Sequence, residues 1–273
     1  MNLQINHSNE QQAAFAFTKQ AAIFDELYAA NSIVQYKRKR VRDHLLLYLQ
    51  QGSTILELNA GTGDDAIFLA EQGHYVHATD IAAGMQERLI EKVKDRGLTQ
   101  KISNELCSFT ALGKLKNKGP YDCVFSNFAG LNCTGELNTV LNSFDNLVRP
   151  GGIVTLVILP KFCLWETALI AKGKFKTATR RFFSANGRNA KIGAAAFKCW
   201  YYRPGFIINQ LESKFKLLKV EGLCTIVPPS YIENFAEQHS KLFSYLCKME
   251  NRLKGKWPWK YIGDYYIISL RKK

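Results

Sequence analysis

Short apolar segments alternate with helical segments between Thr54 and Leu159, and this alternation constrains the possible fold more than any other feature of the chain. Thr54–Leu58 is a short apolar run that ends at a turn, which is typical of a buried strand. The same pattern predicts strands at Tyr75–Asp80, Lys101–Cys107, Tyr121–Ser126 and Ile153–Leu159, with helices at Asp64–Gln72, Ala82–Asp95 and Gly135–Val148. Such an order builds βαβ units, so we expect an α/β fold whose mostly parallel sheet is covered by helices on both faces.

Further elements flank this core. Apolar residues at helical spacing predict helices over Ala13–Ala30 and Ile33–Leu49, and late strands at Phe215–Val220 and Tyr265–Leu270 bring the sheet to seven strands. A helix-rich segment, about Tyr231–Leu253, separates the two late strands. We therefore expect one integrated domain in four parts: an N-terminal helical cap at 1–50, the core at 51–160, a lid insert at 161–213, and C-terminal strands with a helical insert at 214–273.

The positive charge of the chain is concentrated in one segment. The 273 residues carry a formal net charge of +14. Residues 1–160 hold 15 basic and 16 acidic side chains, residues 161–220 hold 13 and two, and residues 221–273 hold nine and five. A positive field attracts anionic partners such as nucleic acid, an acidic membrane surface, or a phosphorylated or carboxylated substrate, although a basic surface also serves solubility alone.

A second basic run lies on a predicted helix. Lys37-Arg38-Lys39-Arg40 resembles a nuclear-localisation run. Helical spacing nevertheless predicts that two or three of these four side chains simply face water.

Composition and motifs exclude several classes of protein. Hydrophobic content of 47% and charged content of 22% are those of a globular protein, not of a disordered, collagen-like or coiled-coil chain. The longest apolar run, Ile153–Pro160, is too short to cross a bilayer, and Met1–His7 lacks the basic start and apolar centre of a signal peptide, so we expect a cytoplasmic protein. Seven scattered cysteines and five histidines form no C-x-x-C or H-E-x-x-H pattern, so we predict neither a disulfide framework nor a metal site.

One turn carries most of the chemistry that the sequence predicts. Glu57 near the end of the first strand is followed by the small-residue turn 59–63 and then by the start of a helix. Small residues let a ligand approach the backbone, and the helix N-terminus offers its positive dipole end. Asp80 ends the next strand, where a doubly wound fold places a ribose-binding carboxylate. Gly61–Ala66 also satisfies G-x-G-x-x-A, so a nicotinamide dinucleotide is an alternative ligand at this point.

Four motifs, in order, resemble those of the class I S-adenosylmethionine-dependent methyltransferases. Glu57 to Gly63 is similar to the first motif, an acidic residue followed by G-x-G at a strand end. Asp80-Ile81 with Met85 resembles the second motif, Tyr121–Asn127 the fourth, and Leu147–Gly152 the turn before the fifth strand. Together with Gly263–Tyr266, the pattern is similar to bacterial small-molecule methyltransferases. The resemblance implies a Rossmann-like fold, with S-adenosyl-L-methionine as cofactor and S-adenosyl-L-homocysteine as its product.

The resemblance also implies a role for the residues of these motifs. Glu57 would orient the turn and the methionine end of the cofactor, and Asp80 would accept hydrogen bonds from both ribose hydroxyls. Ile81 and Met85 would pack on the adenine, although plain core packing is the alternative. Many relatives carry an acidic residue where Ser108 stands, so Phe109 and backbone groups are expected to contribute more to adenine recognition here. The complete expected cofactor-binding set is Glu57, Asn59, Ala60, Gly61, Thr62, Gly63, Asp80, Ile81, Met85, Ser108, Phe109, Asn127 and Phe128.

The acceptor is expected beyond Asn127, at the carboxyl ends of the strands. Methyl transfer from a sulfonium depends on alignment and on exclusion of water, while a phenol or a protonated amine also gains from a general base. No base is evident from the sequence. The candidates for a catalytic group are Glu166, Tyr28, Tyr202 and His239, and those for acceptor binding are Tyr28, Asn132, Trp165, Glu166 and Tyr202.

Several of these candidates have a structural alternative. Glu166 is the only carboxylate between Lys161 and Leu211, and it could instead pair with one of the neighbouring lysines. Tyr28 could be a core residue, and His239 could point to water. Trp200-Tyr201-Tyr202 predicts an insert strand with one tyrosine toward the pocket and one toward solvent.

Three function classes remain open. The first is a methyltransferase acting on a small lipophilic or aromatic metabolite, with the basic insert meeting a carboxylate, a carrier-bound acyl chain or a membrane surface. It is favoured because Asn127–Asn132 lacks the prolines of the N/D-P-P-Y/F signature of nucleic-acid amino methylases. Trp257-Pro258-Trp259 between lysines would suit an interfacial contact or a packed aromatic cluster. The second class is an RNA-modifying enzyme that grips phosphates with Lys161–Lys219. The third is a protein that binds the cofactor without turnover.

Overall fold

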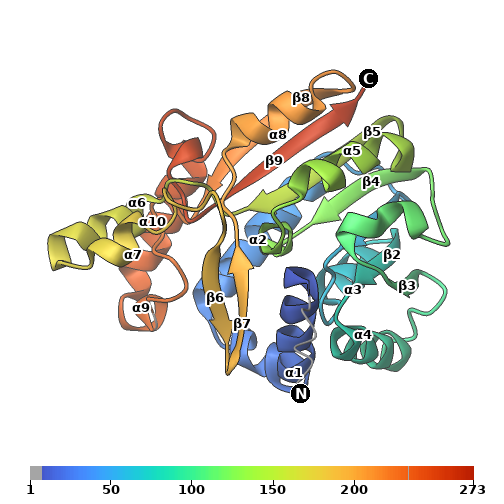
Figure 1. Ribbon diagram of the computed structural model, residues 1–273, viewed down its shortest axis with the longest axis horizontal. Helices are drawn as coiled ribbons and strands as arrows, with labels where there is room; N and C mark the ends of the chain where they lie inside the picture. The colour runs from blue at the N-terminus through green and yellow to red at the C-terminus, as the bar shows by residue number, and fades with distance from the viewer. Residues whose placement is uncertain (1–7, 233) are drawn as a thin grey trace, which may run out of the picture.

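A seven-stranded sheet with helices on both faces forms the centre of the molecule (Figure 1). The computed structural model describes residues 8–232 and 234–273, so the predicted lack of a signal peptide at Met1–His7 lies outside the described residues. The strand order is β3-β2-β1-β4-β5-β9-β8. β9 runs opposite to the other six strands, so the predicted mostly parallel sheet is confirmed. The strands are β1 (Thr54–Leu58), β2 (Tyr75–Asp80), β3 (Ile102–Leu106), β4 (Tyr121–Ser126), β5 (Val148–Ile158), β8 (Phe215–Leu223) and β9 (Tyr265–Lys272).

Alternate side chains of the central strands enter two separate cores, because successive residues of a strand point to opposite faces. Ile55 and Phe125 pack with α2 and α3 on one face, whereas Leu56 and Val124 pack with α5 and α8 on the other. Both faces are buried, which explains why the strands read as nearly continuous apolar runs. The helices that flank the sheet are α1 (Asn9–Ala29), α2 (Ser32–Leu46), α3 (Asp64–Glu71), α4 (Ala83–Asp95), α5 (Leu137–Leu147) and α8 (Pro204–Leu211).

The basic run on α2 is largely buried, which corrects the prediction that it faces water. Of its four side chains only Lys39 is exposed, while Lys37, Arg38 and Arg40 are all less than a tenth exposed. Arg40 reaches Glu221 and Glu250 at 3.2 and 3.4 Å. Lys37 and Arg38 stand three and four residues after buried apolar positions of the same helix, so they share its inward face. A buried cation needs a partner, and each of the three has one.

The segment between β5 and β8 forms an insert, here called the lid insert after the role predicted for it, and that role stays a prediction. It contains α6 (Leu164–Thr167), the 3-10 helix η3 (Ala168–Lys172), α7 (Phe175–Thr179) and a hairpin of β6 (Arg188–Ile192) and β7 (Ala195–Cys199). The insert strand expected at 200–202 is wrong, because β7 ends at Cys199. Neither tyrosine faces solvent, since Tyr201 and Tyr202 are both buried.

A second helical insert lies between β8 and β9, as predicted. It contains α9 (Phe235–Gln238), α10 (Ser240–Leu253) and the 3-10 helix η4 (Trp259–Tyr261). Two more 3-10 helices, η1 (Phe109–Lys114) and η2 (Gly130–Cys133), follow β3 and β4. None of the helices in the described part of the chain combines the length and the apolar character needed to span a membrane.

Candidate functional site

A cavity lies where β1, β2 and β4 end, and α1 forms one of its walls. It brings together all of the expected cofactor-binding residues except Gly63 and Ser108. The residues that line it are Glu10, Ala13, Ala14, Phe17, Phe24, Arg38, Glu57, Asn59, Ala60, Gly61, Thr62, Asp64, Asp65, Asp80, Ile81, Ala82, Met85, Phe109, Asn127, Phe128, Gly130 and Cys133.

The turn after β1 is held open toward this cavity. Asn59 adopts a left-handed backbone with φ of 48°, and its side chain bridges to β4 by donating to the Asn127 carbonyl and accepting from the Ser126 hydroxyl. Gly61 has φ of 58°, and no other atom lies within 4 Å of the position that a Cβ would take there. The backbone at Gly61 is therefore open to a ligand, and its conformation is one that glycine adopts without strain.

Asp80 is fixed by the backbone of this turn and of the next. Its two carboxylate oxygens accept from the amide nitrogens of Gly61 and Ala82 at 2.9 and 2.8 Å. Burial raises the pKa of Asp80 above its usual value, although these backbone hydrogen bonds oppose the rise. Each carboxylate oxygen has a second lone pair, so Asp80 can accept further hydrogen bonds from a ligand.

Glu57 is a buried carboxyl group with a spare oxygen. Its side chain is 2% exposed, and Oε2 has no hydrogen-bond partner among the described residues. Burial raises the pKa of Glu57 well above its usual value, and the nearby Asp65 raises it further. A buried acceptor without a partner is costly, so this oxygen is suited to a cationic or hydrogen-bonding ligand group in the cavity.

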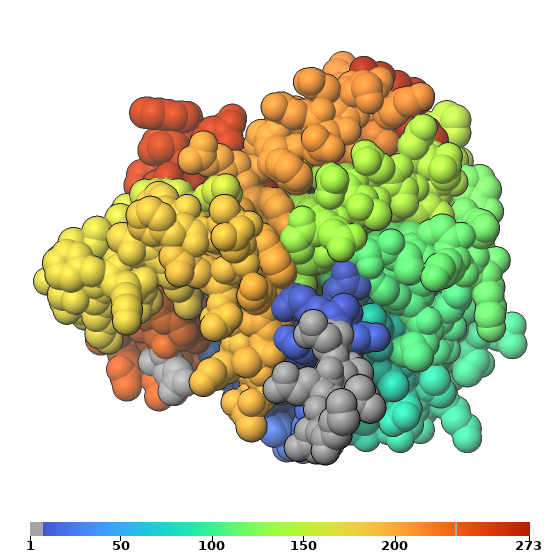
Figure 2. Space-filling model, in the orientation of Figure 1, coloured from blue at the N-terminus to red at the C-terminus, as the bar shows by residue number. Residues whose placement is uncertain are grey.

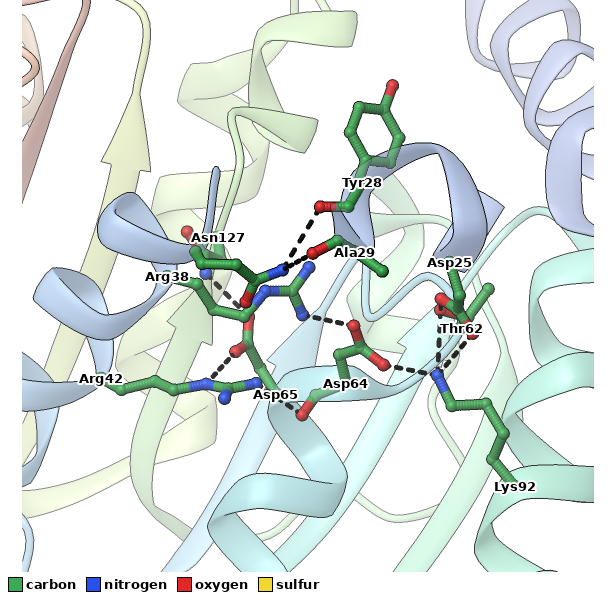
Figure 3. A network of polar contacts seen from close by, with 11 residues as sticks. Asp25, Tyr28, Ala29, Arg38, Arg42, Thr62, Asp64, Asp65, Lys92 and Asn127 are labelled. Atoms are coloured by element: carbon green, nitrogen blue, oxygen red, sulfur yellow. Dashed lines mark hydrogen bonds and ion pairs between the residues drawn. The ribbon is translucent and has the colours of Figure 1, made fainter. Parts of the chain in front are cut away.

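Three cations from two helices surround the first turn of α3, as Figure 3 shows. Arg38 of α2 lies 2.7 Å from Asp64, which Lys92 of α4 contacts from the other side at 2.5 Å. Arg42 lies 2.7 Å from Asp65, whose second oxygen accepts from the Asn127 amide at 2.7 Å. Burial would raise the pKa of Asp64, but Arg38 and Lys92 outweigh it and lower this pKa. Both carboxylates are thus already neutralised within the protein.

Arg38 is a site residue that the sequence analysis missed. It lines the cavity, its guanidinium carbon lies 5.2 Å from the centre of the Phe128 ring, and its Nε has no partner among the described residues. The spacing of Val34, Arg38, Val41 and Leu45 along one helix face is the signal that could have identified it.

The N-terminal helix supplies an acidic group to the site. Glu10 lines the cavity and accepts hydrogen bonds from the hydroxyls of Ser108 and Thr110. Ser108 itself is not among the lining residues, whereas the neighbouring Phe109 is. A carboxylate of α1 therefore contacts Ser108. No signal in the sequence linked Glu10 to this position, because it lies about a hundred residues away along the chain.

Glu166, a candidate base, is held by two arginines. Its carboxylate accepts from Arg180 at 2.9 and 2.6 Å and from Arg181 at 2.6 Å, and Arg181 also contacts Asp264 at 2.6 Å. Burial would raise the pKa of Glu166, but the two arginines lower it. A proton-accepting role would require both ion pairs to break. The alternative for Glu166, an ion pair with a neighbouring lysine, is therefore right in kind but wrong in its partner, because the cations are Arg180 and Arg181.

The same cluster contains the atoms that a metal would need. Cys163, Glu166 and Asp264 bring one potential ligand atom each within 4.8 Å of one another. Arg181 donates to both carboxylates, so a protein cation already lies between them. We assign the cluster to the attachment of the lid.

Three expected acceptor residues make structural hydrogen bonds. Tyr202 donates its hydroxyl to the Thr134 carbonyl at 2.5 Å, and Trp165 donates its indole nitrogen to the Thr225 carbonyl at 3.1 Å. Asn132 is fully buried and contacts the backbone of Leu159 and Trp200. None of these three lines the cavity.

The remaining two candidates, Tyr28 and His239, are exposed. The Tyr28 ring packs on Phe24, a cavity residue, with 4.8 Å between ring centres, and it points away from the polar network in Figure 3. His239 follows α9, and its ring packs on Phe235 at 5.2 Å. Tyr28 therefore stands one side chain from the cavity, whereas His239 does not line it.

Comparison with known proteins identifies the domain that holds this cavity. Residues 55–152 match a family model described as a methyltransferase domain. The demethylmenaquinone methyltransferase of Bacillus pumilus is 29% identical over 154 residues, covering 55% of this chain and 64% of that protein. The tRNA 5-carboxymethoxyuridine methyltransferase of Escherichia coli is 26% identical over 103 residues, covering 38% of this chain and 39% of that protein. The chain thus spans just under two thirds of the first relative.

A solved structure extends the likeness over the whole chain. The 1,6-didemethyltoxoflavin-N1-methyltransferase of Burkholderia thailandensis, solved with 1,6-didemethyltoxoflavin and S-adenosylhomocysteine, superposes with a TM-score of 0.56 at 14% identity, covering 100% of this chain and 93% of that one. Its fold agrees with the resemblance drawn from the four motifs. This chain therefore has the fold of the class I S-adenosylmethionine-dependent methyltransferases, and residues 55–152 match a methyltransferase-domain family.

Proposed function

We propose that the chain transfers a methyl group from S-adenosylmethionine to a small lipophilic or aromatic metabolite. The observation that carries this proposal is the cavity itself, in which Glu57, Asp80 and Arg38 lie beside an apolar wall from α1. The polar and charged groups suit a charged nucleoside, and the apolar wall suits the carbon skeleton of an acceptor.

Three residues of the cavity suit different parts of the cofactor. Glu57, with its unpartnered Oε2, would hold the ammonium group of the methionine part, and Arg38, with its unpartnered Nε, would hold the carboxylate. Asp80, fixed by two backbone amides, would accept from the ribose hydroxyls. When bound there, S-adenosylmethionine supplies a methyl group that is already activated by its attachment to a sulfonium.

The protein then needs to position the acceptor and exclude water. Ala13, Ala14, Phe17 and Phe24 of α1 form an apolar side of the cavity. Alignment of two reactants in such a site converts a bimolecular step into an effectively unimolecular one. We retain Tyr28, which packs on Phe24, as the candidate that orients the acceptor or moves its proton. The demethylmenaquinone methyltransferase among the relatives supports a lipophilic acceptor.

The proposal is tested by comparing metabolites from cells with and without the gene by mass spectrometry. We expect one small molecule to differ by the mass of one CH₂ group, and to be methylated by the purified protein with S-adenosylmethionine. If the purified protein binds neither S-adenosylmethionine nor S-adenosylhomocysteine, or binds a nicotinamide dinucleotide instead, the proposal is wrong.

An RNA acceptor is the second candidate, favoured by the tRNA methyltransferase among the relatives and by the net charge of +11 over residues 161–220. Salt separates the two candidates, because nucleic-acid affinity falls steeply as ionic strength rises. Turnover of a small neutral acceptor should change little between low and physiological salt. Mass changes confined to RNA nucleosides would decide for the second candidate.

A further inference from the structure

Residues 164–183 form a lobe that projects from the body of the protein, here called the lid lobe. It contains α6, η3, α7 and the turn that follows, and its three short helices pack on one another. Figure 2 shows it as the yellow protrusion on the left of the molecule. The cavity lies elsewhere, and no residue of the lid lobe lines it.

The lid lobe exposes an unusual amount of apolar surface. The exposed fractions of Phe183 and Phe175 are 68% and 62%, and those of Phe182, Ile170 and Leu164 are 44%, 41% and 40%. Single exposed apolar residues are ordinary on a protein surface, but five within 20 residues of one projecting lobe mark an interaction site.

The charge of the lid lobe has one sign at its surface. Lys172, Lys174 and Lys176 are exposed and lie between the apolar residues along the chain. The one carboxylate of the lobe, Glu166, is 1% exposed and is neutralised by Arg180 and Arg181. The surface therefore presents lysines and phenylalanines without any carboxylate, and it is complementary to an anionic partner that can also take up apolar side chains.

A second exposed aromatic group adjoins the lid lobe. The Leu164 amide donates to the Ile262 carbonyl at 2.9 Å, which joins α6 to the turn around η4. In that turn Trp257 is 79% exposed, beside the exposed Lys256. Trp259, the other tryptophan of this motif, is half-buried.

We propose that the lid lobe, together with Trp257, docks on an anionic lipid membrane surface. Phenylalanine, isoleucine and tryptophan side chains partition into the boundary between headgroups and acyl chains, while lysines beside them face the lipid phosphates. Nucleic acid would also engage the lysines and stack on the rings, but it offers nothing to Leu164 and Ile170. The inference does not rest on the proposed methyl transfer, because lipid binding is measured without turnover.

The experiment uses the full chain and lipid vesicles in a flotation assay. We expect binding to vesicles that contain phosphatidylglycerol in phosphatidylcholine, weaker binding as salt rises, and little binding to pure phosphatidylcholine. A single-stranded RNA oligonucleotide serves as the second probe under the same conditions. No binding to anionic vesicles would overturn the inference.

Paired variants separate the two parts of the surface. The double variant Phe175→Ser with Phe183→Ser should weaken vesicle binding by about tenfold or more, because it removes two rings that would enter the membrane. Lys172→Gln, Lys174→Gln and Lys176→Gln together should weaken it by about 100-fold, since each lysine near an anionic surface contributes ~1 kcal/mol. The control for the first is Leu47→Ser, which changes a side chain that is 73% exposed just after α2. The control for the second is Lys94→Gln with Lys114→Gln and Lys118→Gln, three exposed lysines outside the lid lobe.

Both controls should bind vesicles like the unaltered protein. Unchanged binding of S-adenosylhomocysteine and unchanged thermal melting would show that the lobe variants remain folded. Equal losses in the lobe and control variants would overturn the inference, because attraction would then be a property of the whole surface. Tight RNA binding that the lysine variant loses and the phenylalanine variant keeps would overturn it in favour of nucleic acid.

Discussion

Three residues of the cavity, Asp80, Glu57 and Arg38, differ in the contacts that hold their side chains. Asp80 is held by two backbone amides and can still accept hydrogen bonds, whereas Glu57 and Arg38 are buried and each has one atom without a partner among the described residues. Unsatisfied polar atoms are rare in buried sites and need a physical explanation. A charged ligand in the cavity, as proposed above, would explain both.

Replacement of Asp80 by alanine tests the proposed ribose contact. Asp80→Ala should weaken binding of S-adenosylhomocysteine by roughly 10- to 100-fold, because hydrogen bonds to a charged acceptor contribute ~1.5–3 kcal/mol. Isothermal calorimetry measures this change directly. Asp43→Ala, which removes an exposed carboxylate of α2 paired with Lys39, serves as the control and should leave the affinity unchanged. An unaltered affinity in the Asp80 variant would remove this residue from the site.

A pair of thiols gives a prediction that depends on pH. The Cys133 thiol hydrogen-bonds to Cys199, which lowers the pKa of Cys199 and raises that of Cys133. Burial raises the pKa of Cys107, and it raises that of Cys247 to about 11. Because the thiolate is the nucleophile, Cys199 should be alkylated by iodoacetamide at a lower pH than the other two half-buried cysteines.

Peptide mass spectrometry after short labelling across a pH series would follow this reaction at each cysteine. Cys133→Ala removes the thiol donor and should shift the labelling of Cys199 toward higher pH. Faster labelling of Cys107 or Cys247 than of Cys199 near neutral pH would contradict the assignment.

At the level of whole elements, α1 is fastened across the cavity at its N-terminal end. Ser8 forms a capping box with Gln11, and Asn9 donates to the carbonyls of Cys133 and Lys198 and accepts from the Lys198 amide. Since α1 supplies Glu10 and an apolar wall to the cavity, these contacts connect the β6–β7 hairpin to the site.

Removal of the Asn9 side chain should loosen this wall. Asn9→Ala is expected to weaken S-adenosylhomocysteine binding by roughly tenfold, since three hydrogen bonds of ~0.5–1.5 kcal/mol each are lost and part of that loss falls on the bound state. Stopped-flow measurements should find the effect in faster dissociation. Glu26→Ala, at an exposed position on the same helix, controls for changes in helix stability. Equal dissociation rates in both variants would show that α1 is not held by Asn9.

The agreement between each predicted strand and the structure depends on the burial and the pairing of that strand. β1, β2 and β4 begin and end where predicted, because their apolar runs are buried on both faces and bounded by turn residues. β5 begins at Val148 instead of Ile153, because Val148 already pairs with Tyr121 of β4, and the register shifts over 149–152 before Ile153 pairs with Cys123. The β6–β7 hairpin and α8 were not predicted. Both strands of that hairpin are short and only partly buried, so their alternation is weak.

On the scale of the whole molecule, Arg181 joins the lid to the core. Its guanidinium is 3% exposed and contacts Glu166 of α6 and both the side chain and the carbonyl of Asp264, next to β9. Because both partners are buried, this cluster is little screened by solvent, unlike ion pairs on the surface.

Loss of Arg181 should therefore be strongly destabilising. Arg181→Met is expected to lower the free energy of unfolding by about 3–5 kcal/mol, because it leaves two buried carboxylates without their shared cation. Urea denaturation monitored by circular dichroism measures the change. Arg180→Met is the matched control, since Arg180 also contacts Glu166 but its side chain is 44% exposed, and its loss should be clearly smaller. Similar losses in the two variants would mean that burial does not set the strength of this cluster.

The sequence alone determined the sheet, the small-residue turn after β1 and the acidic residues Glu57 and Asp80 at the ends of neighbouring strands, because these features depend on local patterns of apolar and small residues. Only the tertiary structure decided which charged groups share a cavity. Arg38 and Glu10 reach it from helices that precede the core, whereas Glu166 is turned away to meet Arg181. Charged side chains pair through space, so the positions of two residues in the sequence do not show whether they pair.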